Sequence, residues 1–486
     1  MPSIDWFIVG EIIYVLIVIC VCLRIIYETR SSTKTLAYLL LTIFIPVAGI
    51  ILYFSIGINY RNKSMYSKKL VRDQKLQERL KIQIFKSSFD ALHSVGDYGL
   101  VYKGLAHMIL KDMMSPLTTN NAVKILINGE QTFKEILLAI NEAQNHIHLE
   151  YYTFENDYIG NTIKDALIRK AKEGVEVRFI YDHFGSRSIR GKFSKELEEA
   201  GVKIYPFHKI TFLLLANRLN YRNHRKIIVI DGHTSFVGGI NVADRYTNDE
   251  SRGEKVYWRD THVCIKGPGS FYLQYIFLCD WNFCSPDKLQ PEQRFFSELP
   301  VSDGGSLVQI VSSGPDSSSP SILYTLLKAI GTAKEEILIT TPYFIPGESL
   351  MDALIIASLS GISVKLLVPY ISDSKFVNAA AHSYYDDLLN AGVRIFRYKK
   401  GFIHAKTVVC DSKLAIIGTA NMDQRSFDLN FEVMSLMLDP KVAEELRDVF
   451  NSDLKHAEEI DAYQWEHRAK WRKFMEKSAR MISPLL

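Results

Sequence analysis

The chain has 486 residues, and its 58 Lys and Arg against 54 Asp and Glu give a formal net charge of +4. This small net charge does not favour nucleic acid as a partner, and the length allows about three domains. The six cysteines have neither zinc spacing nor the density of a disulfide scaffold, so we interpret them as free thiols in a reducing compartment. The hydrophobic content of 47% is slightly high for a wholly soluble protein, and the excess is local.

Two apolar stretches open the chain. Residues 7–23 contain one charge, Glu11, and residues 35–60 contain none. About 20 apolar residues cross a bilayer core, and the chain lacks the basic start and cleavage site of a signal peptide. We therefore predict a two-helix membrane anchor over residues 1–60, with Pro46 and Gly49 able to kink the second helix. A re-entrant hairpin is the alternative.

A basic stretch follows the anchor. Residues 61–86 contain nine basic and two acidic residues. By the positive-inside tendency, this flank and everything after it are cytoplasmic, so the protein is expected in the cell membrane with its catalytic part inside. We predict a basic helical linker over residues 61–120 that binds anionic membrane lipids. An ordinary solvated helix would have the same composition.

Helices and strands then alternate in two similar series. The first series has helices over residues 132–145, 163–172 and 193–200, with strands over 147–154, 175–181 and 202–206. The second has helices over residues 321–333, 350–360 and 379–391, with strands over 336–344, 363–368 and 393–398. This alternation favours an α/β fold of layered sheet and helices. We predict two repeated sheet-and-helix halves over residues 121–300 and 301–486, facing one cleft.

Each half contains one copy of the pattern His-x-Lys-x-x-x-x-Asp. The copies lie 180 residues apart and consist of His224, Lys226, Asp231, His404, Lys406 and Asp411. The same offset relates three further pairs, which are Gly238 and Gly418, Asn241 and Asn421, and Arg245 and Arg425. Six matches in one register are hard to produce by chance, so the pattern indicates an internal duplication.

The motif suits chemistry on a phosphodiester. A short β-branched strand follows each Lys, and the two-residue period of a strand places His and Lys on the same side. An ammonium stabilises phosphate oxyanions, while an imidazole attacks phosphorus or carries a proton. A single copy could equally be a His and a Lys at a solvated strand end, but two copies in one register argue against that alternative.

In this duplicated motif, residues 120–480 resemble the phospholipase D superfamily. The resemblance implies that both motifs line one cleft and that Asn241 and Asn421 help to bind phosphate. It also implies that Glu432, 28 residues after His404, orients that imidazole. Asp260 is our prediction for the corresponding partner of His224.

Asp231 and Asp411 end the two motifs. In each copy, the two-residue period of a strand places the Asp on the opposite side from the His and Lys. Although they belong to the motif that the resemblance makes catalytic, we interpret both as structural residues that hold a turn through charge-assisted hydrogen bonds.

Two further segments have open interpretations. The first half has 11 extra residues between Gly201 and His224. They fall in the region of the apolar run at residues 210–219, which forms either a lipid-contacting loop or a buried helix. The tail, residues 463–486, mixes Trp and Phe with Lys and Arg. It is either an interfacial helix or a closing helix packed on the second half.

The expected reaction follows from chemistry and location together. No metal-ligand set and no nucleotide-binding loop are found, so we expect no cofactor and an exchange of phosphodiesters through a phosphohistidine. The anchor and twin motifs resemble bacterial cardiolipin synthases, which implies phosphatidylglycerol as substrate and cardiolipin and glycerol as products. By the same resemblance, His224 attacks and His404 is the acid. A phospholipase D hydrolase, a nuclease and an inactive scaffold are the alternatives, and the oligomeric state is left open.

Overall fold

The computed structural model describes residues 6–29, 32–54, 74–93, 96–207, 221–248, 256–297 and 305–482. The predicted lipid-contacting loop at residues 210–219 lies outside these residues, and so does the first part of the basic stretch. Within the described residues, the two halves share one mixed sheet of 15 strands.

The strand order is the same in both halves when read outward from the centre of the sheet. The first half contributes β1 (Thr118–Ile127), β8 (Thr261–Lys266), β6 (Thr234–Gly238), β5 (Lys226–Ile230), β2 (His146–Tyr151), β3 (Glu176–Asp182) and β4 (Lys203–Phe207). The second contributes β9 (Ser306–Ser313), β18 (Glu432–Leu438), β16 (Leu414–Gly418), β15 (Thr407–Cys410), β10 (Glu336–Thr340), β12 (Ser363–Pro369), β13 (Arg394–Tyr398) and β19 (Ala457–Glu459). Antiparallel pairing of β1 with β9 joins the halves edge to edge.

The strands that follow the motifs are buried on both faces. In β5, Ile228 and Ile230 pack into the helix-covered core of the first half, whereas Ile227 and Val229 pack into a core between the halves. That shared core also contains Val409 of β15. Burial on both faces explains why residues 227–230 and 408–410 of these strands are all apolar. It also means that the two halves face each other across a common core.

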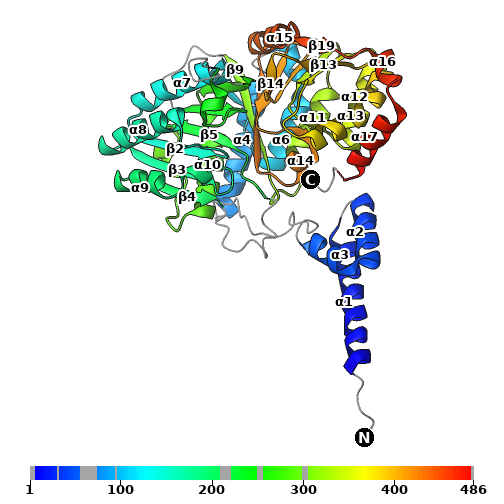
Figure 1. Ribbon diagram of the computed structural model, residues 1–486. Helices are drawn as coiled ribbons and strands as arrows, with labels where there is room; N and C mark the ends of the chain where they lie inside the picture. Colours follow the sequence, from blue (N-terminus) through cyan, green and yellow to red (C-terminus); the bar gives the residue numbers. More distant parts are fainter. Residues whose placement is uncertain are drawn as a thin grey trace.

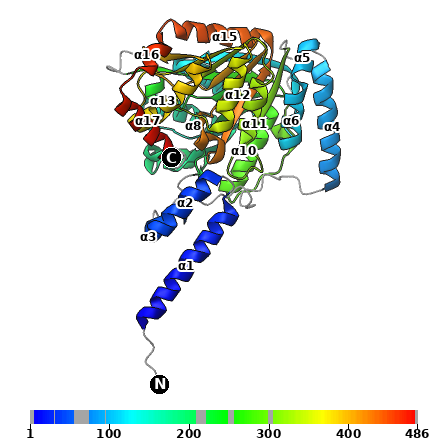
Figure 2. The same ribbon diagram turned by 90° about the vertical axis from the view of Figure 1, so that its right-hand side faces the viewer.

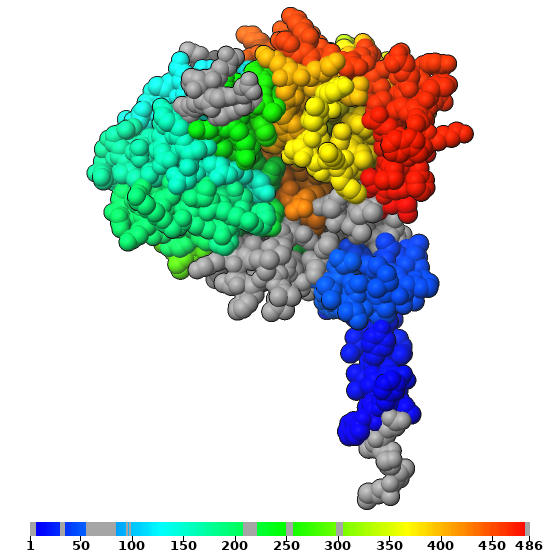
Figure 3. Space-filling model, in the orientation of Figure 1, coloured from blue at the N-terminus to red at the C-terminus, as the bar shows by residue number. Residues whose placement is uncertain are grey.

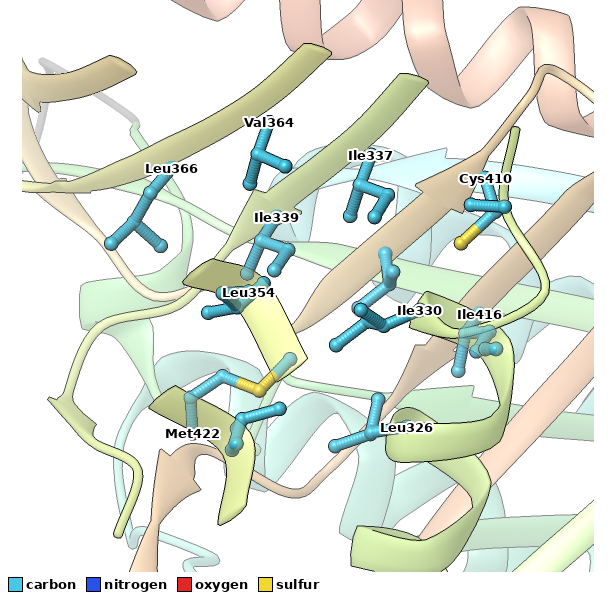
Figure 4. Packing of buried hydrophobic residues seen from close by; sticks show 14 of the residues in the cluster. Leu326, Ile330, Ile337, Ile339, Leu354, Val364, Leu366, Cys410, Ile416 and Met422 are labelled. Atoms are coloured by element: carbon cyan, nitrogen blue, oxygen red, sulfur yellow. The ribbon is translucent and has the colours of Figure 1, made fainter. Parts of the chain in front are cut away.

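Helices cover the outer faces, as the alternating pattern predicts (Figure 1). The first half is covered by α7 (Asn128–Glu142), α8 (Tyr158–Lys172) and α9 (Lys192–Glu199), and the second by α11 (Ser321–Ile330), α12 (Glu348–Leu359) and α13 (Lys375–Asn390). Figure 4 shows Leu326 and Ile330 of α11 packed toward Ile337 and Ile339 of β10. The predicted strand over residues 336–344 is divided, because Pro342 has no N–H to continue the ladder, and β11 (Phe344–Ile345) begins after it.

The remaining elements complete the halves and connect them. The helices are α4 (Gln74–His93), α5 (Asp97–Val101), α6 (Lys103–Met113), α10 (Ser270–Cys284), α14 (Gln424–Asp428), α15 (Pro440–Leu454), α16 (Ala462–Glu466) and α17 (Lys470–Ile482). Short strands are β7 (Tyr257–Arg259), β14 (Gly401–Ile403) and β17 (Met422–Asp423), and single 3-10 turns are Arg187–Ile189, Asp244–Tyr246 and Gln293–Phe295.

The N-terminal anchor projects away from the catalytic halves (Figures 1 and 2). Among the described helices, only α1 (Trp6–Glu28) is long and apolar enough to cross a membrane. The next two, α2 (Ser32–Phe44) and α3 (Pro46–Leu52), break at Ile45 because Pro46 cannot continue the hydrogen-bond ladder. A Cβ on Gly49 would lie 2.5 Å from the Cα of Thr42, so glycine permits the sharp bend. The predicted kink is therefore present, and each of the two pieces is too short to span alone.

Asp231 and Asp411 close their motifs in the same way. Both have a positive φ, 50° and 54°. Each carboxylate accepts three backbone N–H groups at 2.7–3.0 Å, from residues 144–146 for Asp231 and from residues 334–336 for Asp411. These are the charge-assisted hydrogen bonds predicted from the sequence. They fix the start of β2 beside β5 and the start of β10 beside β15, the strands within the two motifs.

Asp231→Ala is expected to lower the free energy of unfolding by about 3 kcal/mol, because three backbone donors lose a charged acceptor. The midpoint of thermal unfolding in detergent measures the loss. Asp231→Asn is the matched control, since Asn tolerates the left-handed φ and keeps one acceptor oxygen, and it should lose less. Unchanged stability of Asp231→Ala together with lost activity would assign the residue to the chemistry instead.

Candidate active site

The two motifs meet at one site between the halves. Burial is the main cause of the low pKa of His404, and repulsion from Lys406, Lys226 and His224 lowers it further. Lys406 likewise contributes to the lowered pKa of Lys226. Such repulsion between charged groups in a buried site acts at short range, so the duplicated residues form a single site.

Main-chain hydrogen bonds tie each motif histidine to the opposite half. The N–H of His404 donates to the carbonyl of Arg259 at 2.7 Å, and the N–H of His224 donates to the carbonyl of Phe431 at 3.0 Å. Just before His404, β14 pairs in parallel with β7 of the first half. Just before His224, Asn223 forms a bridge with Phe431. Each catalytic segment is therefore positioned by the other repeat.

These contacts between the halves also determine which carboxylate orients which imidazole. The pairing that we predicted from the sequence, Glu432 with His404 and Asp260 with His224, is wrong. Glu432 lies 3.0 Å from Nδ1 of His224, and Asp260 lies 2.7 Å from Nδ1 of His404. The bridge at Phe431 brings the following Glu432 to His224, while β7 brings Asp260 to His404. Sequence spacing within one half does not reveal this exchange, because the contacts cross between halves.

The two carboxylates hold neutral imidazoles. Burial lowers the pKa of His224 to about 4 and places that of His404 well below its ordinary value. Burial would raise the pKa of Glu432, but His224 and Lys226 outweigh it and lower the pKa overall. Burial raises the pKa of Asp260 to about 6. At neutral pH each carboxylate therefore accepts Nδ1–H and leaves the Nε2 lone pair available.

Each motif lysine contacts the main chain of the histidine in its own motif. Nζ of Lys226 donates to the carbonyl of His224 at 2.7 Å, and Nζ of Lys406 donates to the carbonyl of His404. Burial lowers the pKa of Lys226 to about 7 and that of Lys406 to about 8. An anion bound between them would favour both charged forms. The site is therefore suited to a phosphodiester monoanion.

We expect kcat/KM for a phosphodiester substrate to fall as pH rises through about 7 to 8, by about tenfold per pH unit for each ammonium lost from the free enzyme. The value falls with rising pH because the lysines bind the anion only when charged, and the phosphodiester itself does not titrate in this range. A pH–rate profile tests this expectation. Lys226→Arg is the control, since a guanidinium stays charged and should remove the lower of the two transitions. A flat profile to pH 9 would contradict it.

Comparison with known proteins agrees with this geometry. The family model described as "Cardiolipin synthase, PLD-like domain" matches residues 136–260 and 326–454, and the model described as "Phospholipase_D-nuclease N-terminal" matches residues 12–57. The major cardiolipin synthase of Bacillus subtilis is 39% identical over 98% of both chains. Cardiolipin synthase of Alkalihalophilus pseudofirmus is 38% identical over 98% of this chain and 93% of its own length. The chain belongs to the cardiolipin synthase family.

A solved structure supports the fold of this cardiolipin synthase family member. Phosphatidylserine synthase of Haemophilus influenzae matches with a TM-score of 0.59 at 15% sequence identity, covering 79% of this chain and 100% of that one. At this identity the likeness concerns the fold alone. It covers enough of the chain to include both halves.

The two predicted phosphate-binding amides have different surroundings in this family member. Nδ2 of Asn241 donates to the hydroxyl of Tyr246 at 2.6 Å, and its Oδ1 accepts from the N–H of Thr153 at 3.2 Å. Oδ1 of Asn421 is buried without a hydrogen-bond partner among the described residues. An amide binds a phosphate oxygen through Nδ2–H and not through Oδ1, so the unpaired oxygen does not bear on that role, and the phosphate role of both residues stays a prediction.

Aromatic rings surround the histidines, and the sequence analysis missed them. The ring of Tyr152 lies 4.9 Å from that of His224, and the rings of Trp258 and Tyr246 lie 5.4 and 6.0 Å from that of His404. Two of them lie close in sequence to predicted site residues, since Tyr246 follows Asn241 by five residues and Trp258 precedes Asp260 by two, and this proximity is the signal that could have found them. Within the described residues, no group of His, Cys, Asp and Glu is arranged to hold a metal ion.

Proposed function

We propose that the chain is a membrane phosphatidyltransferase that converts two phosphatidylglycerol molecules into cardiolipin and glycerol. The observation that carries this proposal is the pair of neutral imidazoles, each held by a carboxylate of the opposite half beside two buried ammonium groups. The names of the relatives support the choice of phospholipid chemistry.

In the first step, Nε2 of His224 attacks the phosphorus of one phosphatidylglycerol. His404 first takes up a proton at Nε2 from solvent as the anionic substrate binds. The bond from phosphorus to the glycerol oxygen then breaks, and His404 gives this proton to the glycerol oxygen. The anionic substrate and Asp260 both favour the protonated imidazole of His404 at that moment. A phosphatidyl group is then bound covalently to His224, and the energy of the phosphodiester is retained in the P–N bond.

In the second step, a hydroxyl of another phosphatidylglycerol attacks the same phosphorus. His404, now neutral, removes the hydroxyl proton, and the P–N bond to His224 breaks. Lys226 and Lys406 stabilise the charge that develops on the phosphate oxygens in both steps, with Asn241 and Asn421 as further donors. Two inversions give net retention of configuration at phosphorus.

Hydrolysis by water is the competing function. The side chains of His224 and His404 are only 12% and 10% exposed, which limits access of water to the covalent intermediate and favours transfer to a lipid hydroxyl. Incubation of the purified protein with phosphatidylglycerol alone, followed by mass spectrometry, distinguishes the two. Cardiolipin with glycerol supports the transferase, whereas phosphatidic acid with glycerol would assign a hydrolase.

The proposal includes a topology. The excess of basic residues after the anchor favours a cytoplasmic catalytic part, and two crossings would place the N-terminus on the same side. A single crossing by α1 would place the N-terminus on the opposite side. The same basic stretch would bind anionic headgroups, in line with the prediction of anionic lipid partners.

Reporters that are active on only one side of the membrane test this topology. We expect a reporter fused after Lys86 and one fused at the N-terminus both to be active in the cytoplasm. Activity of the first reporter only outside the cell would overturn the cytoplasmic assignment. Opposite results at the two positions would replace the hairpin by a single span.

A further inference from the structure

The last helix, α17, is attached to the catalytic part through its charged face. Glu476 of α17 is buried, with Oε2 3.0 Å from Nη1 of Arg468 and Oε1 3.4 Å from Nδ1 of His382. Ala479, one turn further, is buried against the core of the second half. Arg480 lies over the ring of Tyr384, 4.2 Å from its centroid. These contacts fix which face of α17 points inward.

The opposite face is apolar and uncovered. Its large side chains are Trp471, Phe474, Met475 and Met481, which are 71%, 70%, 57% and 82% exposed. Their spacing places them on one stripe of the helix. A helix packed on a soluble core normally buries its apolar stripe, and here that arrangement is reversed. The sequence left open whether the tail is an interfacial helix or a closing helix. In the structure α17 packs on the second half and also presents an apolar face outward.

Basic residues accompany the stripe. Lys470 and Lys477 are exposed, and Lys473 is half-buried. Large apolar side chains accompanied by lysines are typical of helices that lie in the interface of an anionic bilayer, with the apolar face among the lipids and the ammonium groups at the headgroups. An exposed Trp is typical of the same interfacial region of a bilayer, because its ring is apolar and its N–H is polar.

The place of α17 in the molecule agrees with this role. In Figures 1 and 2, α17 lies on the flank of the catalytic part from which α1 projects. Figure 3 shows the C-terminal segment in red on that flank, above the blue anchor. The helix α15, in contrast, lies at the far side of the catalytic part in both ribbon views.

We infer that α17 is a second membrane contact, whose stripe from Trp471 to Met481 inserts into the interface of an anionic bilayer. It would hold the catalytic halves against the surface that contains their lipid substrate. The inference rests on the proposed function only for the choice of an anionic bilayer, since the stripe and its basic neighbours are properties of the chain itself.

The test is a depth measurement on the full chain in vesicles of phosphatidylglycerol and phosphatidylcholine. Cys20, Cys22 and Cys284 are first replaced by Ser, because the remaining thiols, those of Cys264, Cys279 and Cys410, are buried. A nitroxide is then attached through Met475→Cys on α17, or through Asp448→Cys on α15 as the matched control. Asp448 is a suitable control because its side chain is 73% exposed. Collision rates of each label with oxygen and with a water-soluble nickel complex report its depth.

We expect the ratio of oxygen to nickel collisions to be at least several-fold higher at residue 475 than at residue 448, with Trp471→Cys giving the same result as Met475→Cys. Equal ratios at residues 475 and 448 would overturn the inference. So would poor collision with both reagents at residue 475 together with spin–spin broadening that disappears on dilution with unlabelled protein, because the stripe would then be covered by a second copy of the chain. The measurement requires no turnover, so its failure and a failure of the proposed function are distinguishable.

Discussion

His224→Ala is expected to lower kcat for cardiolipin formation by roughly 10⁴- to 10⁶-fold, because the nucleophile of a covalent mechanism is lost. Its imidazole is held with Nδ1 against Glu432, which leaves Nε2 as the attacking atom. No other residue replaces it, since the second imidazole of the site has the separate task of moving protons. The variant should carry no phosphatidyl group after a rapid denaturing quench at alkaline pH, where a phosphohistidine survives.

His404→Ala is the matched comparison for this measurement. With a phosphatidyl ester of 4-nitrophenol, the leaving group needs no proton, so His404→Ala should still form the intermediate on His224. The same variant lacks the base for the second step, and the intermediate should accumulate to about one lipid per enzyme. Lipid phosphate recovered on His404, or in the His224→Ala variant, would refute the assignment of the nucleophile. Net inversion at phosphorus would refute the covalent route altogether.

Asp260→Asn and Glu432→Gln are each expected to lower kcat with phosphatidylglycerol by roughly 10² to 10⁴, because an amide cannot hold the reactive tautomer of the histidine as a carboxylate does. Their effects should separate when the leaving group changes. Asp260 contacts His404, so Asp260→Asn should recover most of the release of 4-nitrophenol from the activated ester. Glu432 contacts His224, so Glu432→Gln should stay slow with both substrates.

The burst of 4-nitrophenol in a stopped-flow experiment measures this difference. The opposite pattern, with recovery by Glu432→Gln, would restore the pairing inferred from sequence spacing and contradict the structure. Equal recovery of both variants would show that the carboxylates act on the site as a whole rather than on one histidine each. Thermal unfolding of both variants serves as the control, because Glu432 also accepts hydrogen bonds from Thr419 and Asn430.

Local patterns in the sequence were sufficient to predict much of this protein. The two copies of the motif predicted which histidines and lysines share one site, and the parity of Asp231 and Asp411 predicted their separate structural role. The strands and helices that were predicted agree with the structure to within a few residues, because alternating burial and helical periodicity are determined by neighbours in the chain. The central strands β1, β8, β9 and β18 and the helices α10 and α15 were not predicted. The apolar N-terminus predicted a membrane helix for the same reason, and Pro46 predicted the kink between α2 and α3.

Only the tertiary structure decided how these parts combine. The edge-to-edge pairing of β1 with β9, the exchange of Glu432 and Asp260 between the histidines, and the outward direction of the stripe on α17 all depend on contacts between residues far apart in the chain. Such contacts are set by the packing of whole layers, and a repeat makes them harder to predict. Each half offers a chemically equivalent partner, so nothing in the local sequence shows whether a carboxylate serves its own histidine or that of the other half.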